Sequence, residues 1–224
     1  MRIIKAVLFE PVGCLAEFPA GPFNELAERL FNVTDDPGET GSEAYWQLLE
    51  LLGESGNTLK HADAQIAERL ELQAVDEAQL YEDVPPALAE LKAMNITLLI
   101  ASSLSAAAVD RFIDRFSLAE FFSGVWTRDN AGDVRGAPLL KAIAAASFQP
   151  EDVMALVDTR DSLELAKEIG ANAMLMINDY DEGRRLVTHA PAGAIVSMHE
   201  LPDAIRLVAE GANVPRGGLA QWKD

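Results

Sequence analysis

The sequence contains a single cysteine, Cys14, and only three histidines, His61, His189 and His199. One cysteine rules out an intramolecular disulfide, and neither residue type shows the close spacing of zinc ligands. Basic residues are also scarce, since 18 Lys and Arg stand against 36 Asp and Glu and give a formal charge of −18. A surface this acidic repels phosphate backbones and anionic lipid headgroups, so we expect neither nucleic acid nor a membrane as a partner.

Long apolar runs are missing as well. No stretch reaches the roughly 18 uninterrupted apolar residues of a membrane-spanning helix. Near the start, only four uncharged residues separate Lys5 from Glu10, far fewer than a secretory signal peptide requires. We therefore expect a cytoplasmic protein. With 49% hydrophobic residues among 224, the chain can bury one good core and a smaller attached unit.

The rest of the chain is organised around residues 3–15 (IIKAVLFEPVGCL). This stretch begins as a short, almost continuous apolar run bounded by Pro and Gly, which is typical of a strand buried on both faces of a parallel sheet. Glu10 stands where the apolar run stops. Ligands bind outside the carboxyl ends of strands in open α/β sheets, so the Glu10 carboxylate is a candidate binding or catalytic group.

Helical periodicity dominates the next part of the chain. Four segments, 22–30, 42–52, 61–72 and 76–81, have apolar residues at helical spacing, and we expect Ser42 to cap the second one. From residue 84 onward strands and helices alternate, which indicates βαβ units and a parallel sheet. The predicted strands are 96–101, 124–127, 153–157, 173–177 and 193–197, and the predicted helices are 85–94, 106–116, 138–146, 162–169 and 202–209.

A sheet that is interrupted after its first strand by helices predicts two units. The predicted fold class is α/β, with a Rossmann-like parallel sheet core formed by residues 1–17 and 83–210. A small all-helical cap, residues 18–82, is inserted after the first strand. The tail, residues 211–224, contains three Gly, a Pro and a lone Trp, and we expect it to be irregular.

Polar residues follow three predicted strands at the same edge of the sheet: Glu10, the pair Ser102 and Ser103, and Asp158. The helical insertion lies between Glu10 and the serine pair, and Arg135 lies between the serine pair and Asp158. This order resembles the haloacid dehalogenase-like (HAD) superfamily, in its phosphoglycolate phosphatase and β-phosphoglucomutase-like branch with a helical cap. The resemblance spans roughly residues 3–209.

The first two motifs of that family lie in the first half of the chain. The first motif is an Asp nucleophile, any residue, a second Asp and then Gly-Thr-Leu, and it stands here as EPVGCL at residues 10–15. Glu10 thus occupies the nucleophile position and Val12 the position of the second Asp. The second motif is a Ser or Thr after an apolar strand, which is matched by Ser102.

The other two motifs lie further along. The third is a Lys shortly before Pro and a helix, where this chain has Arg135 in RGAP, residues 135–138. The fourth is Gly-Asp-Ser/Thr, two residues and a further Asp, which stands here as VDTRDS at residues 157–162, with Ser162 in place of the last Asp. By resemblance, Glu10, Ser102 and Arg135 are then the catalytic residues, and Asp158 is a metal ligand.

The departures from the family's first motif, at Glu10 and Val12, predict an impaired active site. In the family the Asp attacks phosphorus and forms an aspartyl-phosphate. The extra methylene of Glu10 displaces the carboxylate by about 1.5 Å, and a misplacement of about 1 Å can cost on the order of 10²-fold in rate. Val12 cannot protonate a leaving group, and general acid catalysis is worth about 10²–10⁴-fold. Efficient phosphatase activity is therefore not expected.

Two functions remain open from the sequence. In the first, the protein has lost efficient phosphatase chemistry and acts by binding a small phosphorylated or anionic ligand, or a partner. In the second, it is a slow or altered hydrolase of phosphatase or dehalogenase type, because a halide leaves without a proton. By resemblance, Mg²⁺ would be held, weakly if at all, by Glu10, the Val12 backbone carbonyl and Asp158, which are oxygen ligands that suit a hard cation.

Each candidate residue also has a purely structural interpretation. Glu10 would be a solvated residue at a strand end, and Asp158 an N-cap of the helix that follows. Ser102 and Ser103 would cap the next helix, and Arg135 would be a surface residue in a loop.

Three further side chains are candidates for the core. Cys14 lies in an apolar context, which indicates a buried small side chain rather than a reactive thiol. Tyr45 and Trp46 stand on an apolar helix face and would belong to the core or, alternatively, line a pocket under the cap.

Overall fold

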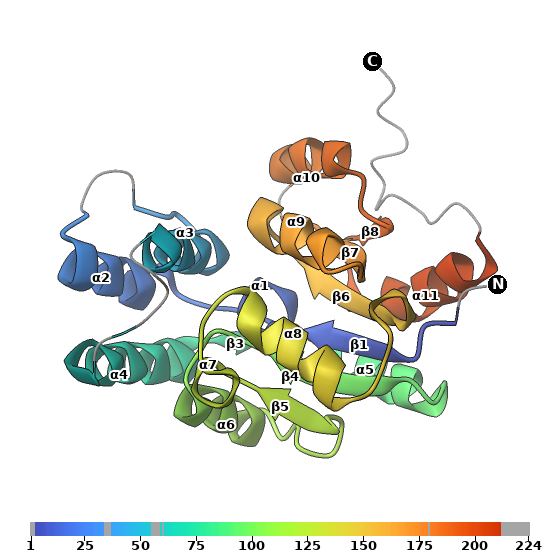
Figure 1. Cartoon of the computed structure of the whole chain (residues 1–224), viewed down its shortest axis with the longest axis horizontal. Helices are drawn as coiled ribbons and strands as arrows, with labels where there is room; N and C mark the ends of the chain where they lie inside the picture. Colours follow the sequence, from blue (N-terminus) through green and yellow to red (C-terminus); the bar gives the residue numbers. More distant parts are fainter. Residues whose placement is uncertain (1–2, 34–36, 55–58, 60, 179, 212–224) are drawn as a thin grey trace.

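The computed structural model describes residues 3–33, 37–54, 59, 61–178 and 180–211. Within them, six parallel strands form one sheet in the order β5-β4-β1-β6-β7-β8 (Figure 1). The predicted α/β fold with a Rossmann-like sheet is confirmed, whereas the predicted tail lies outside the described residues from position 212 onward. The strands are β1 (Ala6–Phe9), β4 (Thr97–Ala101), β5 (Gly124–Trp126), β6 (Val153–Val157), β7 (Asn172–Met176) and β8 (Gly193–Ile195).

β1 lies in the middle of the sheet, between β4 and β6. All four of its residues are buried. Val7 and Phe9 face one hydrophobic layer, and Ala6 and Leu8 face the opposite one, as expected when successive side chains of a strand alternate between faces. A strand that is buried on both faces explains the continuous apolar run in the sequence.

Helices cover both faces of the sheet. α5 (Val84–Ala93), α6 (Ala106–Arg115) and α11 (Leu201–Glu210) pack on the face of Val7 and Phe9. α8 (Gly136–Ala145), α9 (Arg160–Glu168) and α10 (Tyr180–Leu186) pack on the other face. None of the helices in the described part of the chain combines the length and apolar character that crossing a bilayer demands. The short helical turns are α1 (Pro11–Cys14), α7 (Arg128–Ala131), η1 (Pro150–Asp152), η2 (Val187–His189) and η3 (Met198–Glu200).

In the described chain, three inserted helices lie between α1 and α5: α2 (Ala20–Phe31), α3 (Gly41–Glu54) and α4 (His61–Glu77). Figure 1 shows these inserted helices grouped beside the sheet, and α2 packs on both α3 and α4. Two short antiparallel strands, β2 (Ala16–Glu17) and β3 (Gln79–Leu80), join the start and the end of the insertion. The hydrophobic core continues without interruption from the sheet into the inserted helices.

One predicted helix, 76–81, is wrong. α4 continues to Glu77, and residues 79–80 form β3. The backbone N–H of Tyr81 also donates to the Leu15 carbonyl at 3.1 Å. Pairing with the strand that leaves α1 therefore overrides the helical periodicity, which is a local signal only.

The predicted capping role of Ser42 is also wrong, because α3 begins one residue earlier, at Gly41. Thr40 occupies the capping position, and its Oγ1 accepts a hydrogen bond from the backbone N–H of Glu43 at 3.2 Å. A side chain at position 41 would not fit, since a Cβ there would lie 2.0 Å from the carbonyl oxygen of Phe18. Ser42 lies in the first turn of α3, and its hydroxyl donates to Asp158.

Candidate functional site

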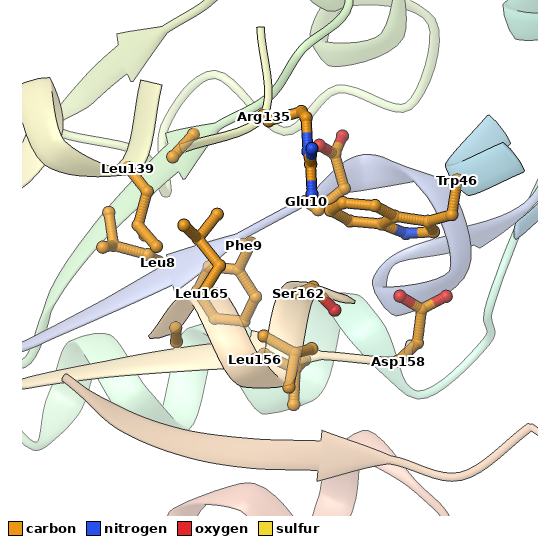
Figure 2. Close-up of a pocket in the computed structure, with 13 residues that line it drawn as sticks. Leu8, Phe9, Glu10, Trp46, Arg135, Leu139, Leu156, Asp158, Ser162 and Leu165 are labelled. Atoms are coloured by element: carbon orange, nitrogen blue, oxygen red, sulfur yellow. The ribbon is translucent and has the colours of Figure 1, made fainter. Parts of the chain in front are cut away.

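The side chains singled out by the sequence meet at the carboxyl ends of β1, β4 and β6. Glu10, Arg135 and Asp158 line a cavity of about 40 Å³, and Figure 2 shows their side chains around it. Ser102 lies beside Glu10, and Val12 is fully buried two residues further along the chain. The predicted site residues therefore share one edge of the sheet, and their chemical roles stay predictions.

Glu10 is held by hydrogen bonds on both carboxyl oxygens. Oε1 accepts from the Ser102 hydroxyl at 2.5 Å, and Oε2 accepts from the Ser103 backbone N–H and from the Tyr45 hydroxyl, both at 3.4 Å. Burial raises the pKa of Glu10 from 4.5 to about 8, against the hydrogen bonds from Ser102 and Ser103, and the charge of Asp158 adds to the rise. Glu10 is therefore partly buried and hydrogen-bonded, not freely solvated, and its chemical role stays a prediction.

The turn after Glu10 is shaped by Gly13. Its φ of +76° is a left-handed conformation that favours glycine, and a Cβ at this position would lie 1.8 Å from Oδ2 of Asp158. The turn and the Asp158 carboxylate can therefore approach each other closely. Val12, one residue earlier, is part of the hydrophobic core and offers no proton.

Asp158 directly follows β6 and is only 6% exposed. Its Oδ2 accepts a hydrogen bond from the Ser42 hydroxyl of α3. The N-cap of α9 is Thr159, whose hydroxyl accepts from the backbone N–H of Ser162, so the interpretation of Asp158 as the cap is wrong. The Asp158 carboxylate lines the cavity instead.

Ser102 and Ser103 are both buried after β4, and neither caps the next helix. That role falls to Ser105, whose hydroxyl accepts from the backbone N–H of Ala108 at 3.2 Å. Ser103 instead accepts a hydrogen bond from the backbone N–H of Arg135 at 2.6 Å. The two serines therefore link the end of β4 to Glu10 and to the start of α8.

Arg135 stands immediately before α8 with φ of 61° and ψ of −111°. Positive φ is uncommon for a residue other than glycine and costs free energy of order 1–3 kcal/mol. The residue is partly buried, and Figure 2 shows its side chain extending toward the indole of Trp46. Arg135 lines the cavity from the turn before α8, and its chemical role stays a prediction.

Helix α3 supplies three side chains to the site that the sequence did not single out as a group: Ser42, Tyr45 and Trp46. Ser42 contacts Asp158, Tyr45 contacts Glu10, and Trp46 lines the cavity. Burial raises the pKa of the Tyr45 hydroxyl well above 10, so this group stays a neutral donor. The i, i+3, i+4 spacing of these residues is the sequence signal that places them on one face of a helix.

Cys14 is fully buried, and its thiol contacts the carbonyl oxygen of Leu156 at 3.5 Å. Burial raises the pKa of Cys14 well above its ordinary value of 9.0, so the thiol stays neutral. The prediction of a buried small side chain is confirmed.

A divalent cation fits this arrangement poorly. Glu10 and Asp158 have the right oxygen chemistry for Mg²⁺. However, both oxygens of Glu10 already accept hydrogen bonds from the protein, so a cation would have to displace donors that hold this carboxyl group. Among the described residues, no group of three or more His, Cys, Asp and Glu is placed to hold a metal ion.

Comparison with known proteins decides the family. Residues 38–176 match the family model described as haloacid dehalogenase-like hydrolase. The chain belongs to the haloacid dehalogenase-like hydrolase family. The matched segment contains Ser102, Arg135 and Asp158, and it begins after Glu10 and Val12.

Individual relatives of this HAD-like chain agree with that assignment. A phosphoglycolate phosphatase of Synechococcus elongatus is 27% identical over 145 residues, which cover 63% of this chain and 68% of the relative. A HAD-like family hydrolase from Streptococcus pneumoniae superposes with a TM-score of 0.68 at 17% identity, covering 89% of this chain and 97% of the other. A β-phosphoglucomutase from Clostridium difficile gives a TM-score of 0.67 at 13% identity, covering 93% and 98%. The predicted membership of the HAD superfamily is confirmed.

Proposed function

We propose that this HAD-like protein has lost efficient phosphatase activity and acts by binding a small anionic or phosphorylated ligand, or a partner. The proposal rests on the hydrogen bonds and the raised pKa of the Glu10 carboxyl group. Its carboxyl group is held through both oxygens by Ser102, Ser103 and Tyr45, and burial raises its pKa to about 8.

A carboxyl group with this pKa is a poor nucleophile near neutral pH. The raised pKa favours the neutral form of Glu10 at pH 7, and only the ionised form attacks phosphorus. The ionised form would also have to leave its hydrogen-bond donors to reach a substrate.

The protein has no proton donor for the leaving group at position 12, where the family has its second Asp. Val12 is fully buried in the hydrophobic core and cannot transfer a proton. Loss of general acid catalysis costs about 10²–10⁴-fold. An alkoxide would therefore depart unprotonated, which makes phosphomonoester hydrolysis slow.

The space beside Glu10 supports binding of a small ligand. A volume of about 40 Å³ has room for a few water molecules. α3 closes over this space, because Ser42 and Tyr45 bond to Asp158 and Glu10. A phosphorylated metabolite of ordinary size would have to displace α3.

We assign residues 18–82 to a cap and residues 1–17 and 83–210 to the core. The grouping of the inserted helices beside the sheet and the pairing of β2 with β3 support these boundaries. Weak binding of Mg²⁺ and a cytoplasmic location are likewise predictions.

A second function is a hydrolase with altered chemistry. It is favoured by Ser102, Arg135 and Asp158, which remain arranged around a carboxyl group. Displacement of a halide needs no proton donor, so Val12 would not impair it. A slow phosphatase that uses Glu10 belongs to the same alternative.

Repair of the first motif tests the proposal. We expect the double variant Glu10→Asp/Val12→Asp to hydrolyse p-nitrophenyl phosphate with Mg²⁺ at least 10²-fold faster than the wild type, because it restores the nucleophile length and the acid. The matched control is Glu10→Asp/Val12→Asn, which has the same size and polarity without an acid and should gain less. A wild type as fast as the repaired variant would contradict the proposal.

A further inference from the structure

Hydrogen bonds connect two of the inserted helices to each other across the site. Glu71 of α4 pairs with Arg128 of α7, and Arg128 donates to the Ser103 backbone carbonyl at 3.2 Å. The Ser103 backbone N–H donates in turn to Glu10, which also accepts from the Tyr45 hydroxyl of α3, both at 3.4 Å. One polar network therefore reaches from α4 through the strand ends to α3.

The ion pair is the most deeply buried charged contact of this network. The side chains of Glu71 and Arg128 are 4% and 8% exposed, and Glu71 also accepts from the Ser105 backbone N–H at 3.0 Å. Burial is the main cause of the raised pKa of the Tyr45 hydroxyl, and the charges of Glu71 and Arg128 act on it in opposite directions. Because such effects weaken with distance, the pair lies near the residue through which α3 contacts Glu10.

An ion pair differs from an apolar contact in what its separation costs. Taking two charges out of water costs about as much free energy as their attraction returns, and both charges recover their hydration when they separate. Separated apolar surfaces lose their stabilisation without such a return. A buried ion pair between elements far apart in the sequence can therefore open and close with a smaller change in free energy.

The closed arrangement leaves a ligand no route around α3. Tyr45 bonds to Glu10, Ser42 bonds to Asp158, and Trp46 lines the cavity with only 9% of its surface exposed. The cavity of about 40 Å³ holds no more than a few water molecules. A larger ligand therefore has to separate the inserted helices from the strand ends.

We propose that the Glu71–Arg128 pair is a latch that holds the inserted helices closed over Glu10, and that the pair separates before a ligand enters. Opening hydrates both charges, breaks the bond between Tyr45 and Glu10, and exposes Trp46 to solvent. The inference rests on the proposed function in one respect, that a ligand has to reach Glu10. It adds the contact that controls access to the site.

Acrylamide quenching of Trp46 fluorescence measures the opening. In the variant Trp126→Phe/Trp222→Phe, Trp46 is the only tryptophan. We expect Glu71→Gln in this background to increase the quenching constant by about twofold or more, because loss of the pair raises the open population. The glutamine keeps the size of Glu71 and its acceptor for the Ser105 N–H, so the change removes the charge.

A matched control lies on the same helix. Asp76 of α4 forms an exposed ion pair with Arg111 at 2.9 Å. Asp76→Asn removes a charge from α4 without touching the buried pair, and solvent screens exposed pairs. Quenching of Trp46 should therefore stay unchanged in this variant, and an increase equal to that in Glu71→Gln would overturn the proposal.

A second tryptophan separates opening from general loosening. In the variant Trp46→Phe/Trp222→Phe, fluorescence comes from Trp126 of β5, which packs on the face of the sheet opposite the inserted helices. Trp126 is also close in sequence to Arg128, so it detects local disturbance there. Glu71→Gln should leave its quenching unchanged. An increase at both tryptophans, or none at Trp46, would overturn the proposal.

Hydrogen exchange in the wild type decides the question if Glu71→Gln does not fold. The indole N–H of Trp46 has no hydrogen-bond partner among the described residues, so its exchange reports the entry of water. We expect a smaller urea dependence than that of global unfolding, because opening exposes less surface. Exchange only through global unfolding would overturn the proposal. None of these measurements uses turnover, so failure of the proposed function would appear separately, as phosphate release from phosphomonoesters.

Discussion

At the scale of single residues, the chemistry of the site depends on how Glu10 is surrounded. Burial favours the neutral carboxyl, while Ser102 and Ser103 donate to its oxygens and oppose that effect. The sequence placed Glu10, Ser102 and Asp158 at one sheet edge, because the carboxyl ends of parallel strands meet there. It did not predict the hydrogen bond from Tyr45, since the pairing of residues 35 positions apart depends on how α3 packs.

The raised pKa of Glu10 makes stability depend on pH. Between pH 4.5 and about 8 the unfolded chain releases the Glu10 proton and the folded protein retains it, so the unfolding free energy falls as pH rises through this range. The fall is on the order of a few kcal/mol. The variant Glu10→Gln does not titrate, so its stability should decline less. Urea unfolding at pH 5 and pH 8 in EDTA measures how much the unfolding free energy falls in the wild type and in Glu10→Gln. An equal fall in the two proteins would contradict the raised pKa of Glu10.

At the scale of helices and strands, the hydrophobic pattern predicted most of the fold. The strands are buried on both faces, so their apolar runs are strong signals, as in β1 and β6. The pattern failed at residues 76–81, where pairing of β3 with β2 decides the structure. It also missed the buried pair of Glu71 on α4 with Arg128 on α7, because the two residues are 57 positions apart and only the packed fold brings them together.

The Glu71 and Arg128 pair fixes an inserted helix to the loop that carries Ser103. Both side chains are less than 10% exposed. Glu71 also accepts a hydrogen bond from the backbone N–H of Ser105 at 3.0 Å, and Arg128 donates to the Ser103 carbonyl at 3.2 Å. Removing one partner leaves a buried charge without its counterion, which costs about 3–5 kcal/mol.

We therefore expect Glu71→Ala to lower the unfolding free energy by about 3–5 kcal/mol in chemical denaturation. The matched control lies on the same helix: Asp76 forms an exposed ion pair with Arg111 at 2.9 Å. Asp76→Ala should cost less than about 1 kcal/mol, because solvent screens exposed pairs. Similar losses in the two variants would show that Glu71 does not have the buried role assigned to it.

At the scale of the whole molecule, the inserted helices and the sheet share one hydrophobic core and meet at the site. α3 reaches Asp158 through Ser42 and Glu10 through Tyr45, and α4 reaches the loop after β4 through Glu71. These contacts close the site around a cavity of about 40 Å³. The fold is that of the HAD-like family, and by resemblance Glu10 and Val12 stand where that family has its nucleophilic Asp and its second Asp.

The proposed loss of efficient phosphatase activity is tested most directly by the turnover of the wild-type protein. Phosphate release from phosphoglycolate and p-nitrophenyl phosphate, measured at pH 7 with saturating Mg²⁺, should stay at least 10²-fold below the order of 1 s⁻¹ that marks the lower end of typical enzyme rates. Glu10→Gln provides the background, since it removes the carboxylate and keeps the shape. Turnover of order 1 s⁻¹ that disappears in Glu10→Gln would contradict the account.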